Sequence, residues 1–287
     1  MSGDSWDAAV MTPRDSGGSR AWVDAYLTRL GLDRVEVHLA GHRGGMLALA
    51  EAHARLVPYE NLAVLRGDGV QCTVEGVVDK IVRRRHGGIG LEVNGGLAAL
   101  LDALGYDVEL RGAAVAAEDG RYGPPLMHAV IVARIPDPWI VDVGFNAEAF
   151  ALPVGGSDDA QAYGASADVA REVQAAGGGL PDPSADLDVT INGAPIYCVE
   201  ARPRRLEDFV APAWWYGTSP DSPHRKSPLC SRATSQGRVT LADRRFIHLA
   251  GGRISERLIE DDADLVATYQ RRFGLQLAEV PQPGITG

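Results

Sequence analysis

The amino-acid sequence predicts an α+β protein in which a helical lobe lies beside a sheet or barrel. Up to Leu104, apolar residues recur at spacings of three and four, which is typical of amphipathic helices. Beyond Gly105 the chain changes to β-branched runs broken by Gly, Pro and Asp, as in strands. A helical pattern returns near the C-terminus, so the order is helices, strands and a mixed tail.

Four helices are expected in the first part of the chain, each bounded by a residue that starts or stops a helix. Their expected ranges are 21–30, 45–57, 73–85 and, after Asn94, 95–104. Gly31 follows the first helix and Pro58 ends the second. Thr73 can cap the third helix and Asn94 the fourth, because short polar side chains accept hydrogen bonds from free helical N–H groups.

The strands are expected in five β-branched segments, followed by one last helix. The expected strands lie within 106–115, 128–135, 138–145, 188–203 and 237–254, and the helix within 262–273. Residues from about 160 to 186 are rich in Ala, Gly, Asp and Ser, so we expect a mobile insertion there. The first 20 residues lack the pattern of a signal peptide and are expected to form a flexible extension.

Composition and charge exclude several classes of function. Of the 287 residues, 45% are hydrophobic and 23% charged, which is ordinary for a globular protein. The formal net charge of −10 disfavours binding to nucleic acid or to an anionic membrane surface. No apolar run approaches the about 20 residues that span a bilayer.

Cysteine and histidine usage indicates neither disulfides nor a metal site. The three cysteines, Cys72, Cys198 and Cys230, are widely spaced and odd in number, which favours a reducing cytoplasm. The seven histidines show no ligand spacing with cysteines or acids, so no metal is expected.

Several separated motifs stand in one order along the chain. They are HARLVPYENL (53–62), RRHGGIGLEVNG (84–95), a strand histidine at His128, VDVGFN around Asp142 and TSPDSPH (218–224). Arylamine N-acetyltransferases carry H-x-x-x-x-P-F-E-N-L, R-R-G-G-x-C-x-E-x-N-G, a strand histidine, V-D-V-G-F-G and S-T-S-P-x-S-x-F. The chain therefore resembles that family from about Trp22 to Asp243.

The resemblance implies a fold and a domain division. It implies an N-terminal helical bundle (21–104), a central β-barrel-like domain (105–205) and a C-terminal α/β lid (206–287) around a cysteine-protease-like core. In the family, a Cys-His-Asp triad takes an acyl group from a thioester and passes it to an amine. The resemblance places the histidine and the aspartate at His128 and Asp142, which lie on what should be adjacent strands.

The nucleophile position does not match the family. Gly90 stands where the resemblance requires the cysteine, so no covalent intermediate can form there. We expect the three cysteines of the chain to be small buried hydrophobes, with Cys230 the least unsuited to replace the missing thiol. Two further departures are Tyr59 for Phe and Asn146 for the last glycine of V-D-V-G-F-G. The resemblance also implies a substrate site at Ile89, Asn146, Thr218 and Ser219.

The two remaining members of the triad suggest a reaction without a covalent step. His128, oriented by Asp142, can act as a general base for an amine that attacks an acyl thioester directly. Backbone N–H groups from Gly88 to Leu91 could stabilise the oxyanion. The donor would be acyl-CoA or a carrier-protein thioester, with no permanent cofactor and with an acyl carrier protein as a candidate partner. Since the family includes enzymes that close amide bonds in polyketide-derived products, amide synthesis in secondary metabolism is the expected setting.

Three alternatives stay open at this point. The first is a pseudoenzyme that binds a small aromatic or acyl ligand in the cleft. The second is a cyclase, isomerase or hydrolase that uses the same His128–Asp142 dyad. The third is that Gly90 is an engineered change in an otherwise ordinary acetyltransferase.

Overall fold

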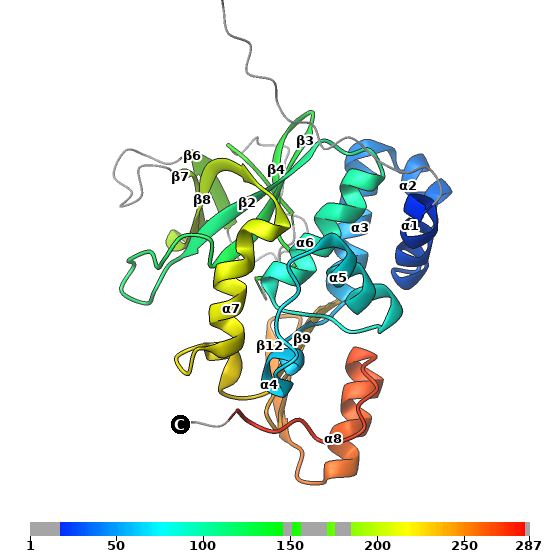
Figure 1. Ribbon diagram of the computed structural model, residues 1–287, viewed down its shortest axis with the longest axis vertical. Helices are drawn as coiled ribbons and strands as arrows, with labels where there is room; N and C mark the ends of the chain where they lie inside the picture. Colours follow the sequence, from blue (N-terminus) through cyan, green and yellow to red (C-terminus); the bar gives the residue numbers. More distant parts are fainter. Residues whose placement is uncertain (1–17, 146–150, 156–170, 176–184, 285–287) are drawn as a thin grey trace, which may run out of the picture.

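The computed structural model describes residues 18–145, 151–155, 171–175 and 185–284. Within these ranges a helical lobe lies beside one sheet, and a second sheet lies below both in the view of Figure 1. This arrangement agrees with the α+β class that the order of the elements predicts.

The helical lobe is formed by the first part of the chain. Its elements are α1 (Gly18–Arg29), α2 (Arg34–Leu39), α3 (Gly41–Leu56), α4 (Leu62–Arg66), α5 (Val74–Val78), the π-helical turn η1 (Asp79–Arg83) and α6 (Gly90–Ala103). Thr73 caps α5 as expected, because its hydroxyl accepts a hydrogen bond from the N–H of Gly76. The expected helix 73–85 is therefore α5 continued by the wider turn η1.

Helix α6 begins at Gly90, four residues before the expected cap at Asn94. The early start is stabilised by Glu92, whose carboxylate accepts a hydrogen bond from the N–H of Ile89. Gly95 and Gly96 do not break the helix, because a Cβ there would lie 2.6 Å from side-chain atoms of Leu206 and Ile81, respectively. The small residues let neighbouring elements pack directly against the helix backbone.

The seven-stranded sheet contains the residues of the central part of the chain. Its order is β5-β4-β3-β2-β8-β7-β6, and neighbouring strands are antiparallel. The strands are β2 (Val108–Val115), β3 (His128–Ile135), β4 (Asp137–Val141), β5 (Ala151–Pro153), β6 (Arg171–Ala175), β7 (Ala185–Ile191) and β8 (Ala194–Arg204). The expected segment 188–203 is thus a hairpin of β7 and β8, turned at Asn192–Gly193, where both residues have positive φ.

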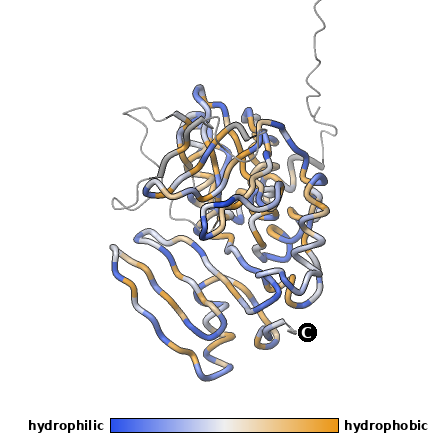
Figure 2. Tube along the Cα trace, turned by 90° about the vertical axis from the view of Figure 1, so that its left-hand side faces the viewer, coloured by the Kyte–Doolittle hydropathy of each residue, from blue (hydrophilic) through white to orange (hydrophobic). Residues whose placement is uncertain are grey.

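The five-stranded sheet joins β1 near the helical lobe to four strands of the C-terminal part. Its order is β1-β9-β10-β11-β12. Its strands are β1 (Tyr59–Glu60), β9 (Leu229–Thr234), β10 (Gly237–Ala242), β11 (Arg245–Ala250) and β12 (Arg253–Leu258). The helical elements of this part of the chain are η2 (Leu206–Phe209), α7 (Val210–Thr218), η3 (Pro223–Arg225), α8 (Asp262–Thr268) and η4 (Tyr269–Phe273). Polar and apolar residues alternate along its strands in Figure 2, as in a sheet with one face exposed.

The largest buried cluster joins the helical lobe to the seven-stranded sheet. In it, Leu97 and Leu101 of α6 pack with Ile131 and Val141 of β3 and β4. A separate cluster around Tyr269 and Phe273 packs α8 and η4 against the five-stranded sheet. Helix α6 is therefore the central support of the fold, and its N-terminus points to the site described below.

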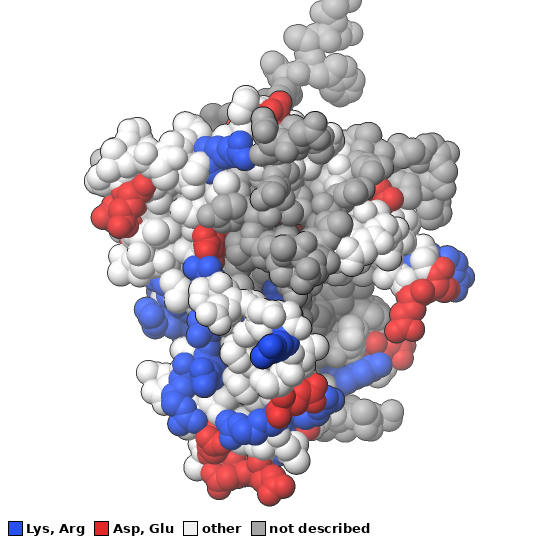
Figure 3. All heavy atoms as spheres, turned by 180° about the vertical axis from the view of Figure 1, so that it is seen from behind, with Lys and Arg blue, Asp and Glu red and all other residues white. Residues whose placement is uncertain are grey.

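Parts of the expected insertion and extension lie outside the described residues. Within the segment 160–186, residues 171–175 differ from the expectation because they form β6, which pairs with β7 and buries Val173. Among the residues that the structure describes, no helix has the length and hydropathy to cross a membrane, and no cluster of three metal-ligating side chains occurs. Lys and Arg side chains gather on the lower part of the face shown in Figure 3.

Candidate active site

His128 and Asp142 lie side by side at the ends of two neighbouring strands. His128 is the first residue of β3, and Asp142 directly follows β4, which pairs with β3. The Nε2 atom of His128 lies 2.8 Å from Oδ2 of Asp142. Their side chains are only 6% and 7% exposed, so the pair is shielded from water. The structure thus brings together the two residues that the motifs single out.

Asn94 holds the carboxylate of Asp142 in place. Its side-chain amide donates to Oδ1 of Asp142 at 2.7 Å and to the carbonyl of Ala129 at 2.6 Å. The N–H of Gly144 donates to the same Oδ1 at 2.9 Å. Asn94 is therefore an interior residue of α6 that links the helix to both strands of the dyad, and it does not cap the helix.

The surroundings of Asp142 keep it ionised. Burial by itself raises the pKa of this carboxyl group, but the charge and hydrogen bond of His128 outweigh burial, helped by Asn94 and Gly144, and hold the pKa below its ordinary value. An ionised Asp142 accepts the hydrogen bond from Nε2–H of His128. The other ring nitrogen, Nδ1, is then free to accept a proton.

The Nδ1 atom of His128 faces Gly90, at the start of α6. A Cβ atom at Gly90 would lie 2.8 Å from Nδ1 and 2.9 Å from Cε1 of His128, and 3.1 Å from the carbonyl of Gly144. These separations are too short for ordinary contacts, so the imidazole takes part of the room that a side chain at position 90 would need. The ring of His128 therefore narrows the space beside position 90.

A cavity of about 260 Å³ opens in front of this pair. Its described lining is mostly apolar or aromatic, with His128 and Gly90 on one side. The lining residues are Tyr59, Ile89, Gly90, Leu91, Val115, Met127, His128, Gly144, Phe145, Tyr216, His224 and Leu229. The ring centroids of Phe145 and Tyr197 lie 5.2 Å and 5.4 Å from the ring centroid of His128. These two rings limit the movement of the imidazole.

Two backbone N–H groups at the start of α6 remain unpaired beside the cavity. Of the four candidates from Gly88 to Leu91, the N–H of Gly88 donates to Pro58 and that of Ile89 donates to Glu92. The N–H groups of Gly90 and Leu91 have no hydrogen-bond partner among the described residues. As the first N–H groups of a helix, they can bind an oxyanion.

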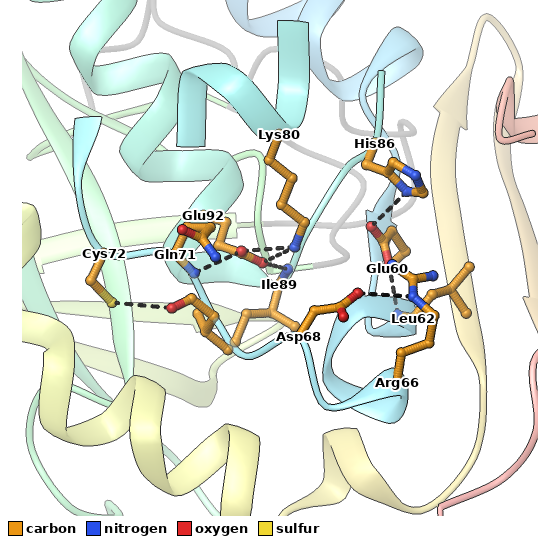
Figure 4. A network of polar contacts seen from close by, with 11 residues as sticks. Glu60, Leu62, Arg66, Asp68, Gln71, Cys72, Lys80, His86, Ile89 and Glu92 are labelled. Atoms are coloured by element: carbon orange, nitrogen blue, oxygen red, sulfur yellow. Dashed lines mark hydrogen bonds and ion pairs between the residues drawn. The ribbon is translucent and has the colours of Figure 1, made fainter. Parts of the chain in front are cut away.

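A buried ion pair fixes the loop that leads into α6. In Figure 4, Lys80 points from η1 to Glu92, and its Nζ lies 2.7 Å from both carboxylate oxygens. Glu92 also accepts the N–H groups of Gln71 and Ile89, so one carboxylate holds three segments. Gly87 completes the loop, because a Cβ there would lie 1.7 Å from the carbonyl oxygen of Pro58. The resulting loop places Ile89 and Gly90 against the cavity.

The other expected site residues have different fates. Ile89 lines the cavity, whereas Thr218 and Ser219 do not. The hydroxyl of Thr218 donates to Trp214, and that of Ser219 accepts from the N–H of Asp221, so both serve the end of α7. Asn146 lies outside the described residues.

Tyr216 and His224 are lining residues that sequence reasoning missed. Tyr216 is on α7 and His224 in η3, where their rings lie 4.6 Å apart. The available signal was the last residue of TSPDSPH, a histidine where S-T-S-P-x-S-x-F has an aromatic residue without a polar atom.

None of the three cysteines reaches the position of the missing nucleophile. Cys230 is fully buried in β9, and burial raises its pKa well above the ordinary value. Cys198 is buried in β8. Cys72 is partly buried, its Sγ lies 4.0 Å from the carbonyl of Val70, and burial raises its pKa to about 11. All three are thus poor nucleophiles near neutral pH.

Comparison with known proteins agrees with these observations. The family model described as N-acetyltransferase matches residues 45–281. An arylamine N-acetyltransferase of Mycolicibacterium smegmatis is 28% identical over 266 residues, which cover 90% of this chain and 93% of the relative. The solved M. smegmatis structure has a TM-score of 0.71 at 26% identity, covering 89% of this chain and 92% of the other.

A further solved structure, Mycobacterium marinum arylamine N-acetyltransferase in complex with CoA, has a TM-score of 0.75. It is 24% identical and covers 91% of this chain and 95% of the other. At this identity, the similarity establishes a common fold.

Proposed function

Because the chain belongs to the arylamine N-acetyltransferase family, we propose that it is an N-acyltransferase that joins an acyl thioester to an amine without an acyl-enzyme intermediate. One observation carries the proposal. His128 is oriented by Asp142 through a hydrogen bond of 2.8 Å, and its Nδ1 atom is turned to Gly90 beside the cavity. A base is thus in place where no nucleophilic side chain is.

The proposed reaction is one addition followed by one elimination. The amine nitrogen attacks the thioester carbonyl carbon while Nδ1 of His128 accepts a proton from the amine. The oxyanion that forms is stabilised by the N–H groups of Gly90 and Leu91. The C–S bond then breaks, the thiolate takes the proton from His128, and the products are an amide and a free thiol.

Electrostatics supports His128 as the group that carries this proton. The ionised Asp142 stabilises the imidazolium that forms in the first step and fixes which nitrogen carries the proton beforehand. General acid–base catalysis contributes typically about 10²–10⁴-fold. Holding the amine and the thioester in one cavity adds the effect of proximity, which needs no covalent step.

Acyl-CoA is the first donor to test, because the M. marinum relative of the same fold has been solved with CoA. A carrier-protein thioester and a place in secondary metabolism are finer parts of the proposal. They predict faster turnover with an acyl group on a carrier protein than with the same group on CoA.

The test measures amide formation and thiol release with a panel of acyl-CoA donors and aromatic amines. His128→Ala should lower kcat/KM by about 100-fold or more. His248→Ala, a histidine on β11 in the other sheet, is the control and should retain activity. Intact-mass spectrometry during turnover should show no acyl adduct on the protein. Full activity of His128→Ala, or a stable acyl adduct, would overturn the proposal.

A second candidate, a protein that binds a small aromatic or acyl ligand without turnover, is favoured by one observation. The imidazole of His128 lies so close to Gly90 that the space for a reacting carbonyl beside the helix is narrow. Tight ligand binding, without product from any thioester and amine of the panel, would support this candidate. A cyclase, isomerase or hydrolase would depend on the same dyad and would also lose activity in His128→Ala.

A further inference from the structure

A second polar pair, Tyr59 and His224, lines the cavity. Tyr59 is on β1 and His224 in η3, and both contribute to the cavity wall. The hydroxyl of Tyr59 lies 3.4 Å from Nδ1 of His224, and their ring centroids are 6.2 Å apart. Neither residue has a task in the proton transfer proposed for His128.

His224 is held firmly in this position. The side-chain amide of Asn61 donates to the carbonyl of His224 at 2.9 Å and to that of Ser227 at 2.8 Å. The side-chain oxygen of Asn61 accepts a hydrogen bond from the N–H of Leu229 at 2.8 Å. Asn61 is 2% exposed, so these bonds are protected from water and fix the turn that carries the imidazole.

Tyr216 braces the ring of His224 from the side. The two rings lie 4.6 Å apart at an angle of 66°, in an edge-to-face arrangement. The hydroxyl of Tyr216 donates to the carbonyl of Met127 at 2.7 Å, so its proton is not available to a ligand. The imidazole of His224 is thus preorganised in both position and orientation, which favours ligand binding.

The pair is electrically neutral near pH 7. Burial lowers the pKa of His224 to about 4, and burial raises the pKa of Tyr59 above its ordinary value. A phenol is a stronger donor than a neutral imidazole, and an imidazole nitrogen is a stronger acceptor than a phenol oxygen. The favoured bond therefore runs from Tyr59 to Nδ1 of His224, which leaves the proton of the ring on Nε2.

The Nε2–H group of His224 has no partner among the described residues. A neutral donor of this kind suits a neutral oxygen acceptor such as a carbonyl, an ether or a hydroxyl. A carboxylate is disfavoured, because the described lining contains no Lys or Arg to compensate its charge. The volume of about 260 Å³ is at the small end of ligand cavities, which favours a compound with a single ring.

We propose that Tyr59 and His224 select the acyl acceptor, and that the preferred acceptor is a single-ring aromatic amine bearing a neutral oxygen substituent remote from the amine. The oxygen accepts a hydrogen bond from Nε2–H of His224, while the amine is directed to His128. This inference rests on the proposed function, because it names the substrate class of the same cavity.

The experiment compares 4-aminoacetophenone with 4-isopropylaniline, which have similar shapes but differ in the carbonyl oxygen. Dissociation constants are measured by calorimetry on the wild-type chain and on His224→Phe, Tyr59→Phe and His248→Phe. The wild-type chain should bind the ketone more tightly than 4-isopropylaniline. This ratio of dissociation constants should fall about 10-fold in His224→Phe, which is the effect expected of one lost hydrogen bond. Tyr59→Phe should cause a smaller loss in the same direction, because the tautomer of His224 is then less well fixed.

His248→Phe is the matched control, since it makes the same substitution at a histidine of β11 outside the described cavity lining and should leave the preference unchanged. Thermal melting and circular dichroism establish that each variant is folded. An unchanged preference in folded His224→Phe would overturn the inference. Because the experiment measures binding, its result is valid even if no turnover is found. The inference and the proposed function can therefore fail separately.

Discussion

The Nδ1 atom of His128 lies 2.8 Å from the point that a Cβ atom would take at Gly90. The absence of a side chain at position 90 and the placement of the imidazole therefore depend on each other. The ring is held from the other side by Asp142, and the aromatic ring of Phe145 lies 5.2 Å from it. As a result, the base lies directly beside the free N–H groups at the start of α6.

Gly90→Ala is expected to destabilise the protein, although alanine is the better helix former. The added methyl group forces the imidazole of His128 away from Asp142, and overpacking of this kind costs typically about 1–3 kcal/mol. Urea unfolding measures the expected loss in the free energy of unfolding.

The control for Gly90→Ala is a double-mutant cycle with His128→Ala. Without the imidazole, the methyl group at position 90 has room, so the same change should then be neutral or stabilising. An equal loss in both backgrounds would contradict the steric explanation and would assign the effect to the carbonyl of Gly144, which lies 3.1 Å from the added atom.

Asp142→Asn should lower activity through the tautomer of His128. An asparagine can place its oxygen where Oδ1 accepts from Asn94 and Gly144, and its NH₂ group then points at Nε2. Nε2 must now accept a hydrogen bond, so the ring proton moves to Nδ1 and the base is lost. We expect kcat/KM to fall by about 10²–10⁴-fold, with a small change in stability.

Two measurements on Asp142→Asn distinguish loss of the base at His128 from misfolding. They are the KM for the amine and the midpoint of urea unfolding. The comparison variant is Asp188→Asn on β7, a partly buried aspartate that accepts a hydrogen bond from Tyr122 and lies outside the described cavity lining. It should keep its activity. Activity of Asp142→Asn near the wild-type value would show that the orientation of His128 does not depend on the carboxylate.

The sequence predicts the dyad better than it predicts the cavity around it. His128 and Asp142 are carried by motifs on two strands whose hydrophobic patterns are strong, and the strands pair as neighbours. The contact of Tyr59 with His224 spans 165 positions and depends on the path of the chain between α7 and β9. No local pattern encodes such a contact.

The limits of helix prediction are visible at α6 and α2. Asn94 is a good capping residue, so the sequence favours a helix that starts at residue 95. In the structure its side chain instead donates to Ala129 and Asp142 from the interior of α6, which begins at Gly90. Helix α2 was missed because it is only six residues long and buries one of them, Val37. Its capping box, made by Asp33 and Glu36, was the available signal.

Lys80→Ala should be strongly destabilising. Lys80 is 4% exposed and makes an ion pair of 2.7 Å with Glu92, so its removal leaves a buried carboxylate without its cation. Loss of one partner of a buried pair costs typically about 3–5 kcal/mol. Arg83→Ala is the matched control in the same turn, because its 3.4 Å pair with Asp79 is exposed and should be worth about 0.3–0.5 kcal/mol. Similar losses in the two variants, measured by urea unfolding, would contradict the assigned role of Glu92.

The free energy of unfolding should fall as the pH is lowered below about 6.5, the ordinary pKa of histidine. Burial lowers the pKa of His53 to about 3 and that of His224 to about 4, so both are neutral in the folded state. Between pH 6.5 and these values, the unfolded chain binds protons that the folded chain does not. Stability is therefore fully present above pH 6.5 and is lost on acidification, by about 1.4 kcal/mol per pH unit for each histidine.

The histidine contribution to this pH dependence can be isolated at His53. His53→Phe removes one titrating group, so its unfolding free energy should vary less steeply between pH 6 and 4, by about one proton. Tyr26→Phe is the control, because it removes the 2.9 Å hydrogen bond to Nε2 of His53 but keeps the buried imidazole and should retain the steep slope. The lowered pKa of Asp142 acts in the same direction but below about pH 4, the ordinary value of a carboxyl group, so it does not disturb the comparison. Equal slopes in His53→Phe and the wild-type chain would mean that His53 becomes protonated without unfolding.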